Sequence, residues 1–309
     1  MPRVSVIMPC FNHALFVGES IEAVLAQSVA DLELIIVDDC SRDDSRTVIE
    51  KYAGSDRRVR AIYHDTNLGA SRSRNDGIRA AQGEYLAFCD ADDVWMSMKL
   101  ARQLEVLQKD CAHDVAYCDA EIINERGIKT GKRFSDQFPV PGNGSGRLFH
   151  RLCAHNFVNM QTAILRRECI ADVGYFDERI KWVEDWWFWV KVSHRHSFAY
   201  TNEALAKYRV HPQSTGVVQR QGYKANRIKV FHRILRNYPE IPSKLKSEIY
   251  YHIAAALKGL GKKNQARRCF IRSMELNRSN LRSLLRVVLS LSKRSLRQSQ
   301  MRPSNLVAR

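Results

Sequence analysis

Four short apolar runs alternate with helical or loop segments over the first ~90 residues, and this alternation constrains the fold more than any other feature. The first run, Val4 to Met8, is followed by apolar residues at helical spacing from Leu15 to Gln27. The later runs span Leu32 to Val37, Val59 to Tyr63 and Tyr85 to Cys89. Because strands that alternate with helices form parallel sheets covered on both faces, we predict a protein of the α/β class.

Polar residues follow each predicted strand, at the point where the strand should reach solvent. They are Asn12, which stands beside the aromatic Phe11 in the turn Pro9 to His13, then Asp38, Asp39, Asn67, Asp90 and Asp92. In open parallel sheets, ligands bind at the carboxyl ends of the strands. We therefore predict one binding site along this edge.

The stretch GEYLAFCDADDVW places three carboxylates directly after a buried strand. On an extended chain, residues two apart share a face, so Asp90 and Asp92 point together and Ala91 points away. Such a pair suits a divalent cation that prefers oxygen ligands. The alternative is that one aspartate caps a helix from Met96 to Lys109 and the others are solvated.

A second acidic pair, Glu184 and Asp185, begins a predicted helix within KWVEDWWFWVKVS. Trp186, Trp189 and Val190 share one face of this helix. Core packing is the ordinary explanation of such an aromatic stripe, and the acidic pair is also compatible with simple complementarity to the helix dipole.

The remaining segments of the first two thirds predict further strands and loops. Strands are expected at Val115 to Ile123, Met160 to Arg166 and Ala204 to Tyr208, with a hairpin turn at Asn124 to Gly127. Pro139 to Gly146 is rich in glycine, but no strand precedes it and no lysine follows in phosphate-loop register. We interpret it as an ordinary loop.

The positive charge of the chain is concentrated in its C-terminal third. Residues 1–219 hold 27 Lys and Arg against 30 Asp and Glu, whereas residues 220–309 hold 22 against 3. A surface of this sign suits an anionic membrane or nucleic acid, with a solvated helix face as the alternative. Leucine-rich faces beside the charges favour a membrane surface or a protein partner, and no nucleic acid is expected.

The basic part is predicted to be helical. Tyr250 to Asn277 pairs two amphipathic helices across Gly259 to Lys263, with Ala254, Ala255 and Ala266 where two helices approach closely. This pair, at about 247–280, resembles one tetratricopeptide unit. A last amphipathic helix is expected at Leu281 to Leu296, and a disordered tail from Gln298.

The eight cysteines show no paired spacing of a zinc site, and several lie inside apolar runs, which is typical of a reducing compartment. No apolar run reaches the length of a bilayer span, and Val4 to Met8 is too short for a signal peptide. We expect a cytoplasmic protein, peripheral on the inner face of the cell membrane through its basic helices.

Taken together, five motifs resemble glycosyltransferase family 2, whose members are inverting enzymes with the GT-A fold, a Rossmann-like and mostly parallel sheet. The motifs are VSVIMPCFN, IIVDDCSRDDS, NLGASRSRNDGIRAAQGEYLAFCDADD, GYFDE and EDWWFWVKVS. They occur in the family's order and cover residues 1 to about 215. This implies a catalytic domain at 1–219, a basic helical extension at 220–297 and a disordered tail at 298–309.

The resemblance also implies roles for individual residues. Asp92 would ligate Mn²⁺ or Mg²⁺, with a further metal or phosphate contact from His211 in its YRVHP context. Asp185 would be the general base, beside Glu184 as the second catalytic carboxylate. Arg74 would face the diphosphate or position Asp38, and Trp182 or Trp186 would stack on an acceptor sugar. The full set implied for donor binding is Pro9, Phe11, Asn12, Asp38, Asp39, Arg72, Arg74, Asp90 and Ala91.

From these roles we predict a metal-dependent inverting hexosyltransferase. It would move sugar from a nucleoside diphosphate donor, expected to be a UDP-sugar, to a glycan or lipid-linked oligosaccharide in surface polysaccharide synthesis. A carboxylate base and a divalent cation are what displacement of a nucleoside diphosphate requires. Two alternatives stay open: a catalytically silent scaffold acting through its C-terminal helices, and a nucleotidyltransferase, for which the glycine-rich signature after the first strand is missing.

Overall fold

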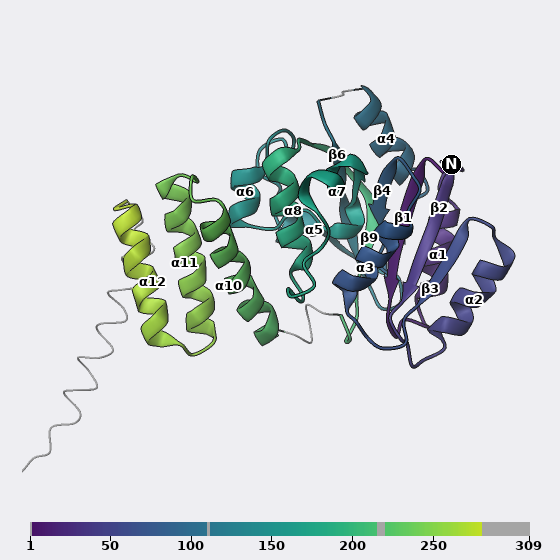
Figure 1. Ribbon diagram of the computed structural model, residues 1–309, viewed down its shortest axis with the longest axis horizontal. Helices are drawn as coiled ribbons and strands as arrows, with labels where there is room; N and C mark the ends of the chain where they lie inside the picture. Colours follow the sequence, from purple (N-terminus) through teal and green to yellow (C-terminus); the bar gives the residue numbers. More distant parts are fainter. Residues whose placement is uncertain (1, 110–111, 215–219, 280–309) are drawn as a thin grey trace, which may run out of the picture. The chain divides into compact units, whose positions relative to one another are not determined.

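The computed structural model describes residues 2–109, 112–214 and 220–279 of the chain (Figure 1). The chain divides into two compact units, with the boundary between Arg220 and Gln221. The first unit is built on a nine-stranded sheet in the order β3-β2-β1-β4-β8-β6-β9-β5, with β7 paired to β6. The strands of the first unit are β1 (Val4–Cys10), β2 (Leu32–Asp38), β3 (Val59–Tyr63), β4 (Tyr85–Phe88), β5 (Val94–Trp95), β6 (Val115–Asn124), β7 (Lys129–Arg133), β8 (Ala163–Arg166) and β9 (Phe198–Val210).

Helices connect most of these strands, while β4 and β5, and β6 and β7, follow one another without a helix between them. The helices are α1 (Val17–Leu25), α2 (Ser45–Ser55), α3 (Ala70–Ala80), α4 (Lys99–Lys109), α5 (Phe134–Gln137), α6 (Phe149–Ala154), α7 (Glu168–Val173) and α8 (Glu184–Arg195), with a 3-10 turn η1 at Met160–Thr162. The four strands β3-β2-β1-β4 run parallel, as the alternation predicted.

Helices cover both faces of these parallel strands, which confirms the expected architecture. Val6 and Met8 of β1 pack with Ile21 of α1 in the main core. Ile7, on the opposite face, lies against α3, where a Cβ added to Gly77 would stand 2.5 Å from the Ile7 side chain. Glycine at position 77 therefore lets α3, the helix that also carries Arg74, lie close against β1.

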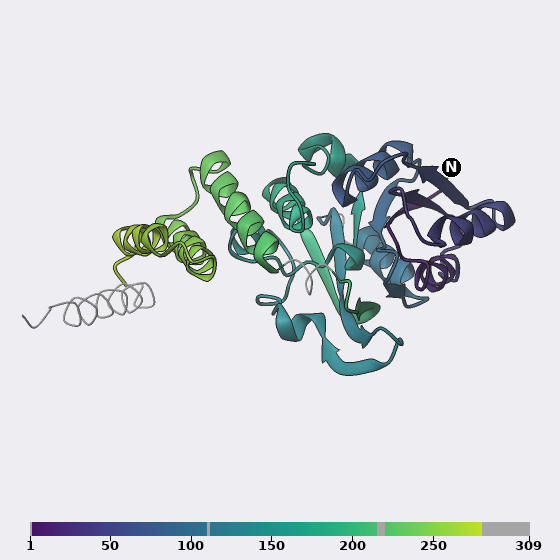
Figure 2. The same cartoon turned by 90° about the horizontal axis from the view of Figure 1, so that it is seen from below.

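The other half of the sheet is mixed. β8 is antiparallel to both β4 and β6, while β6 and β9 run parallel with register shifts between Tyr117 and Ala120. Figure 2 shows the two long strands β6 and β9 side by side beneath the helices. The end of β9 is fixed to the turn after β4, because the Arg209 backbone N–H donates to Asp93 Oδ1 at 2.8 Å. This contact brings His211 to the predicted site.

Several predicted boundaries shift in the structure. β1 continues through Pro9 to Cys10, so Pro9 belongs to the strand and not to the turn. β4 ends at Phe88, and α4 begins at Lys99 instead of Met96. The predicted strand from Met160 begins at Ala163 after the 3-10 turn, whereas β9 is much longer than Ala204 to Tyr208. Pro139 to Gly146 is a loop, as expected.

The second unit contains three described helices, α10 (Arg220–Asn237), α11 (Ser243–Gly259) and α12 (Lys263–Leu276). α11 and α12 pair as the sequence predicted, with Ala254 and Ala266 buried. Ser247 and Ser273 each donate from the hydroxyl to the other's carbonyl oxygen at 2.6 Å, which fixes the register of the two helices.

The predicted helix Leu281 to Leu296 and the tail from Gln298 lie outside the described residues. Among the helices that the structure describes, none combines the length and apolarity needed to cross a bilayer. The cysteines within buried segments pack as small hydrophobes, as expected for Cys10, Cys89, Cys118, Cys153 and Cys169.

Candidate active site

The ends of β1, β2 and β4 meet at one edge of the sheet. Cys10 is in register with Asp38, and the Asp39 N–H donates to the Cys10 carbonyl oxygen at 2.8 Å. The Cys89 N–H donates to the Ile7 carbonyl oxygen at 3.0 Å, which places the DADD turn beside the end of β1. The parallel topology therefore gathers the predicted carboxylates at one edge.

Asp38 and Asp39 differ in what engages them, although both are buried. Asp39 accepts hydrogen bonds from the Leu68 and Gly69 N–H groups at 2.8 and 2.7 Å, and His64 Nδ1 lies 2.8 Å from its Oδ1. Both of its oxygens are therefore occupied in shaping the loop before α3. Oδ1 of Asp38 is buried and has no hydrogen-bond partner among the described residues, so Asp38 is the member of the pair with a free acceptor.

The turn after β1 exposes an aromatic side chain. Phe11 is 39% exposed, whereas Asn12 has a positive φ of 57° and accepts the Arg42 N–H at 2.8 Å through Oδ1. Asn12 thus holds the turn after β2, and Phe11 is the residue of this motif that is open to a ligand. Pro9, inside β1, is partly buried.

Arg74 forms a buried ion cluster with two of the predicted site residues. Its guanidinium donates to Glu184 Oε1 and to Asp90 Oδ1, each at 2.8 Å, and it lies over the Phe176 ring. Burial alone would lower the pKa of Arg74, but the two carboxylates hold it above its ordinary value. The prediction that Arg74 positions Asp38 is wrong, because its partners are Asp90 and Glu184.

Arg72 lies apart from this cluster. Its Nε donates to Asp76 at 2.7 Å one helical turn away, and its side chain is 42% exposed. Arg72 and Arg74 therefore differ in burial and in partners, although the sequence grouped them.

Asp185 stands next to the ion cluster at the start of α8. Its Oδ2 accepts a hydrogen bond from Asn156 Nδ2 at 2.9 Å. Burial raises its pKa from 3.8 to about 7, and the neighbouring Glu184 adds to the rise while Arg74 opposes it. A carboxyl with a pKa near neutrality can exchange a proton at physiological pH.

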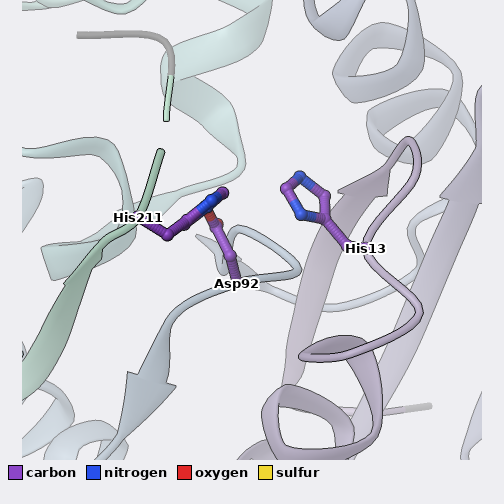
Figure 3. Close-up of side chains that lie close together, drawn as sticks. All are labelled: His13, Asp92 and His211. Atoms are coloured by element: carbon purple, nitrogen blue, oxygen red, sulfur yellow. The ribbon is translucent and has the colours of Figure 1, made fainter. Parts of the chain in front are cut away.

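Asp92 faces a different group of side chains, shown in Figure 3. His211 Nε2 lies 3.0 Å from Asp92 Oδ2, so the two residues predicted to bind metal are in contact. His13 completes the group: each residue offers one ligand atom, and these atoms all lie within 4.8 Å of one another. Burial alone would raise the pKa of Asp92, but the hydrogen bond from His211 and the field of His13 lower it.

Carboxylate and imidazole donors suit a divalent cation, and cis ligands around such an ion lie about 3 Å apart, as Asp92 and His211 do here. Nδ1 of His13 is buried with no hydrogen-bond partner among the described residues. The donor set and this unsatisfied nitrogen therefore fit a metal ion.

One expectation for the DADD turn is corrected. Asp90 and Asp92 lie in a turn beyond β4, not on an extended strand, so they do not share a face and have different partners. Ala91 is buried and its carbonyl oxygen accepts from the Ser20 hydroxyl at 3.0 Å, so its assignment to donor binding stays a prediction. Burial and the nearby Asp92 and Asp90 raise the pKa of Asp93 well above its ordinary value.

The tryptophans of α8 are core residues. Trp186 is 2% exposed and its indole N–H donates to the Leu152 carbonyl oxygen at 2.6 Å, so the expectation that it stacks on an acceptor sugar is wrong. Trp182 is partly exposed and has a positive φ of 66°. It remains the aromatic candidate near Asp185.

Sequence reasoning missed His13 and Asn156. His13 was visible as the last residue of the turn Pro9 to His13, directly after a strand that ends at the site. Asn156 had no local signal, because it lies in the loop between α6 and η1 and reaches Asp185 across the fold.

The family model described as Glycosyl transferase family 2 matches residues 5–174, more than half of the chain. The chain belongs to this family. An uncharacterized glycosyltransferase of Rickettsia prowazekii (strain Madrid E) is 29% identical over 226 residues, covering 69% of this chain and 66% of that protein. The putative teichuronic acid biosynthesis glycosyltransferase TuaG of Bacillus subtilis (strain 168) is 42% identical over 112 residues, 36% of this chain and 44% of TuaG.

Solved structures share the fold. S. aureus TarS 1-349 in complex with UDP-GlcNAc superposes with a TM-score of 0.64 at 19% identity, over 99% of this chain and 94% of that chain. The mannosyltransferase PcManGT from Pyrobaculum calidifontis, in complex with GDP-Man and Mn²⁺, gives a TM-score of 0.65 at 19% identity, over 94% and 80%. At this identity the likeness concerns the fold, which is the GT-A type that the motifs implied. The matched region spans two thirds or less of the two curated relatives.

Proposed function

We propose that the protein transfers a sugar from a nucleoside diphosphate donor to a hydroxyl group with inversion at the anomeric carbon, and that Asp185 is the general base. The observation that carries the proposal is the placement of the Asp185 carboxyl, which is hydrogen-bonded by Asn156 and stands next to the ion cluster that joins Glu184, Arg74 and Asp90. Its raised pKa agrees with the role of a base. Family membership and the GT-A fold of neighbours bound to nucleotide sugars support it.

The donor would lie along the ends of β1 and β2. Asp38 Oδ1, a buried acceptor with no partner among the described residues, would accept from the base or ribose, and Phe11 would lie against the base. We favour a UDP-sugar. TarS was captured with UDP-GlcNAc and PcManGT with GDP-Man, so the base is the first property to test.

Asp92 and His211 would hold Mn²⁺ or Mg²⁺, and the bound ion would neutralise the charge that develops on the departing diphosphate. Asp90 would approach the sugar, since its Oδ1 is fixed by Arg74 and its side chain is 31% exposed. Arg72, with an exposed guanidinium, would meet the diphosphate.

Asp185 would take the proton of the acceptor hydroxyl as that oxygen bonds to the anomeric carbon and the diphosphate leaves. A positioned base of this kind contributes about 10²–10⁴-fold to the rate. Asn156 would orient its carboxylate, and Glu184 would hold Arg74 in place between the two sides of the site. Attack on the face opposite the leaving group inverts the sugar.

The acceptor is proposed to be a glycan or a lipid-linked oligosaccharide of the cell surface, which agrees with the teichuronic acid biosynthesis for which TuaG is named. We place the enzyme in the cytoplasm. Its C-terminal part, from residue 220, would contact an anionic membrane or a protein partner through its excess of Lys and Arg.

The variant Asp185→Asn tests the proposal, with Asp31→Asn as a matched control. Asp31 is exposed and precedes β2, at the opposite end of the strands from the site. We expect Asp185→Asn to bind UDP with Mn²⁺ normally and to lose about 10²–10⁴-fold in sugar transfer, while Asp31→Asn is unchanged. Wild-type transfer by Asp185→Asn, or retention of the anomeric configuration in the product by NMR, would refute the mechanism.

A further inference from the structure

Three side chains from distant parts of the chain converge at the metal site. His13 follows β1, Asp92 belongs to the turn after β4, and His211 follows β9 (Figure 3). His211 and Asp92 are in contact at 3.0 Å, and the ligand atom of His13 lies within 4.8 Å of theirs. The turn and the two strand ends that carry these residues meet only in the folded sheet.

The ring of His13 lies near the Phe16 ring, with centroids 6.4 Å apart, but the described residues do not use its Nδ1. Its backbone N–H donates to Ser45 Oγ at 2.9 Å, which fixes the residue, but Nδ1 is buried without a hydrogen-bond partner. An unsatisfied buried polar atom costs about 1–3 kcal/mol, so it needs an explanation. The His13 and His211 rings meet edge to face, with centroids 6.0 Å apart.

The positions of both imidazoles are well defined. The Ala14 N–H donates to Asp43 Oδ2 at 2.9 Å, which braces the turn that carries His13. His211 is 5% exposed and its ring centroid lies 4.9 Å from that of Phe16. The Arg209 Nε donates to the carbonyl oxygen of Asp92 at 2.8 Å, which holds the turn that carries this carboxylate. The site is therefore built before any ion arrives.

We propose that His13 is a third protein ligand of the divalent cation, and that the resulting set of two imidazoles and one carboxylate selects Mn²⁺ over Mg²⁺. Mg²⁺ demands near-ideal octahedral oxygen coordination and gives up its water reluctantly, so two nitrogen ligands cost it more than they cost Mn²⁺, a first-row ion that accepts mixed nitrogen and oxygen donors. Three protein ligands leave about three positions of an octahedral ion for donor oxygens or water.

The inference deepens the proposed function, since it rests on the same metal site, but it is tested by metal binding without catalysis. Binding of Mn²⁺ to the full chain is measured by the EPR signal of free Mn²⁺, with and without UDP, and with Mg²⁺ as competitor. Pulsed EPR on the bound Mn²⁺ then counts imidazole ¹⁴N couplings. The variants are His13→Ala and His13→Gln, with His150→Ala, an exposed histidine, as the control.

We expect two imidazole couplings in the wild type and one in either His13 variant. Mn²⁺ affinity should fall about tenfold or more in these variants, with a smaller loss for Mg²⁺, because even outer-shell changes cost about 10–100-fold. The control should match the wild type. Circular dichroism identifies variants that fail to fold. If the His13 variants do not fold, the number of imidazole couplings in the wild type alone decides whether a second histidine binds the ion.

A single imidazole coupling in the wild type, or no binding of Mn²⁺ with or without UDP, would overturn the proposal. So would unchanged Mn²⁺ affinity in the His13 variants with weaker UDP binding in chelator, because His13 would then contact the diphosphate. Two couplings in a protein that binds no nucleoside diphosphate would support the metal ligand and refute the proposed function instead.

Discussion

Asp90 and Asp92 stand two residues apart in one turn, yet their side chains have different partners: an arginine for Asp90 and histidines for Asp92. Asp90 is neutralised by the buried Arg74, which Glu184 holds from the other side. The Asp92 carboxylate contacts the His211 imidazole and lies near that of His13, and no ion pair joins it to an arginine or lysine among the described residues. The first cluster carries its own cation, and the second has the composition of a site that receives one from outside.

This difference explains how one short turn can serve two tasks. A carboxylate paired with arginine is held in place and does not need an ion, since the guanidinium already satisfies it. A carboxylate beside imidazoles, with no arginine on its oxygens, can share a divalent ion with the imidazole nitrogens. We interpret the Asp90 side as the sugar side, next to the base Asp185, and the Asp92 side as the diphosphate side.

Removing the Arg74 guanidinium should have the largest effect of these changes, and the effect should be on stability. Arg74→Met leaves the buried Glu184 and the partly exposed Asp90 without their shared partner, and breaking a buried ion pair costs about 3–5 kcal/mol of unfolding free energy. Arg72→Met, on an exposed side chain of the same helix, should change stability by less than about 0.5 kcal/mol. Urea unfolding measures the free energy of unfolding of both variants. A loss in Arg74→Met as small as that in Arg72→Met would show that the ion cluster adds no stability.

Exchanging each aspartate for asparagine separates the two sides by metal affinity. Asp92→Asn should weaken Mn²⁺ binding by about 100-fold, because a charged ligand is lost, whereas Asp90→Asn should leave it unchanged. Calorimetric titration of Mn²⁺ measures both. Equal weakening in the two variants would mean that the aspartates share the ion, against the partners seen here.

The pH profile tests the sugar side alone. With a pKa of about 7, Asp185 is protonated below neutrality, so kcat/KM should fall about tenfold for each pH unit below that value.

The raised pKa of Asp185 also affects stability: the contribution of the neutral carboxyl is full below about pH 4 and is lost as pH rises through about 7. Thermal unfolding of Asp185→Asn should lack this dependence, and a flat kcat/KM from pH 5 to 8 would exclude Asp185 as the base.

The parallel half of the fold followed from the sequence because its strands are short buried apolar runs bounded by turns. β3 has the predicted bounds, and β1, β2 and β4 differ by one or two residues. The bounds and pairing of the strands in the mixed half were harder to predict from the sequence. β9 is partly exposed over Thr201 to Glu203, so its middle has no apolar signal, and its pairing with β6 depends on contacts 80 or more residues apart in the chain.

The site was predicted as a set of residues, while their pairing was not. The carboxylates could be placed at the strand ends, and the contact between Asp92 and His211 agrees with their shared assignment. The partners of Arg74, the engagement of Asp39 by the loop before α3 and the approach of His13 depend on where loops fold. No local pattern records such contacts.

The most direct test of the account is calorimetric binding of UDP, GDP, CDP and dTDP to the purified protein, each with Mn²⁺, Mg²⁺ or chelator. We predict that one diphosphate, expected to be UDP, binds tightly with Mn²⁺ and loses most of its affinity in chelator. If no diphosphate binds under any of these conditions, the acidic edge is structural and the proposed transfer reaction is wrong.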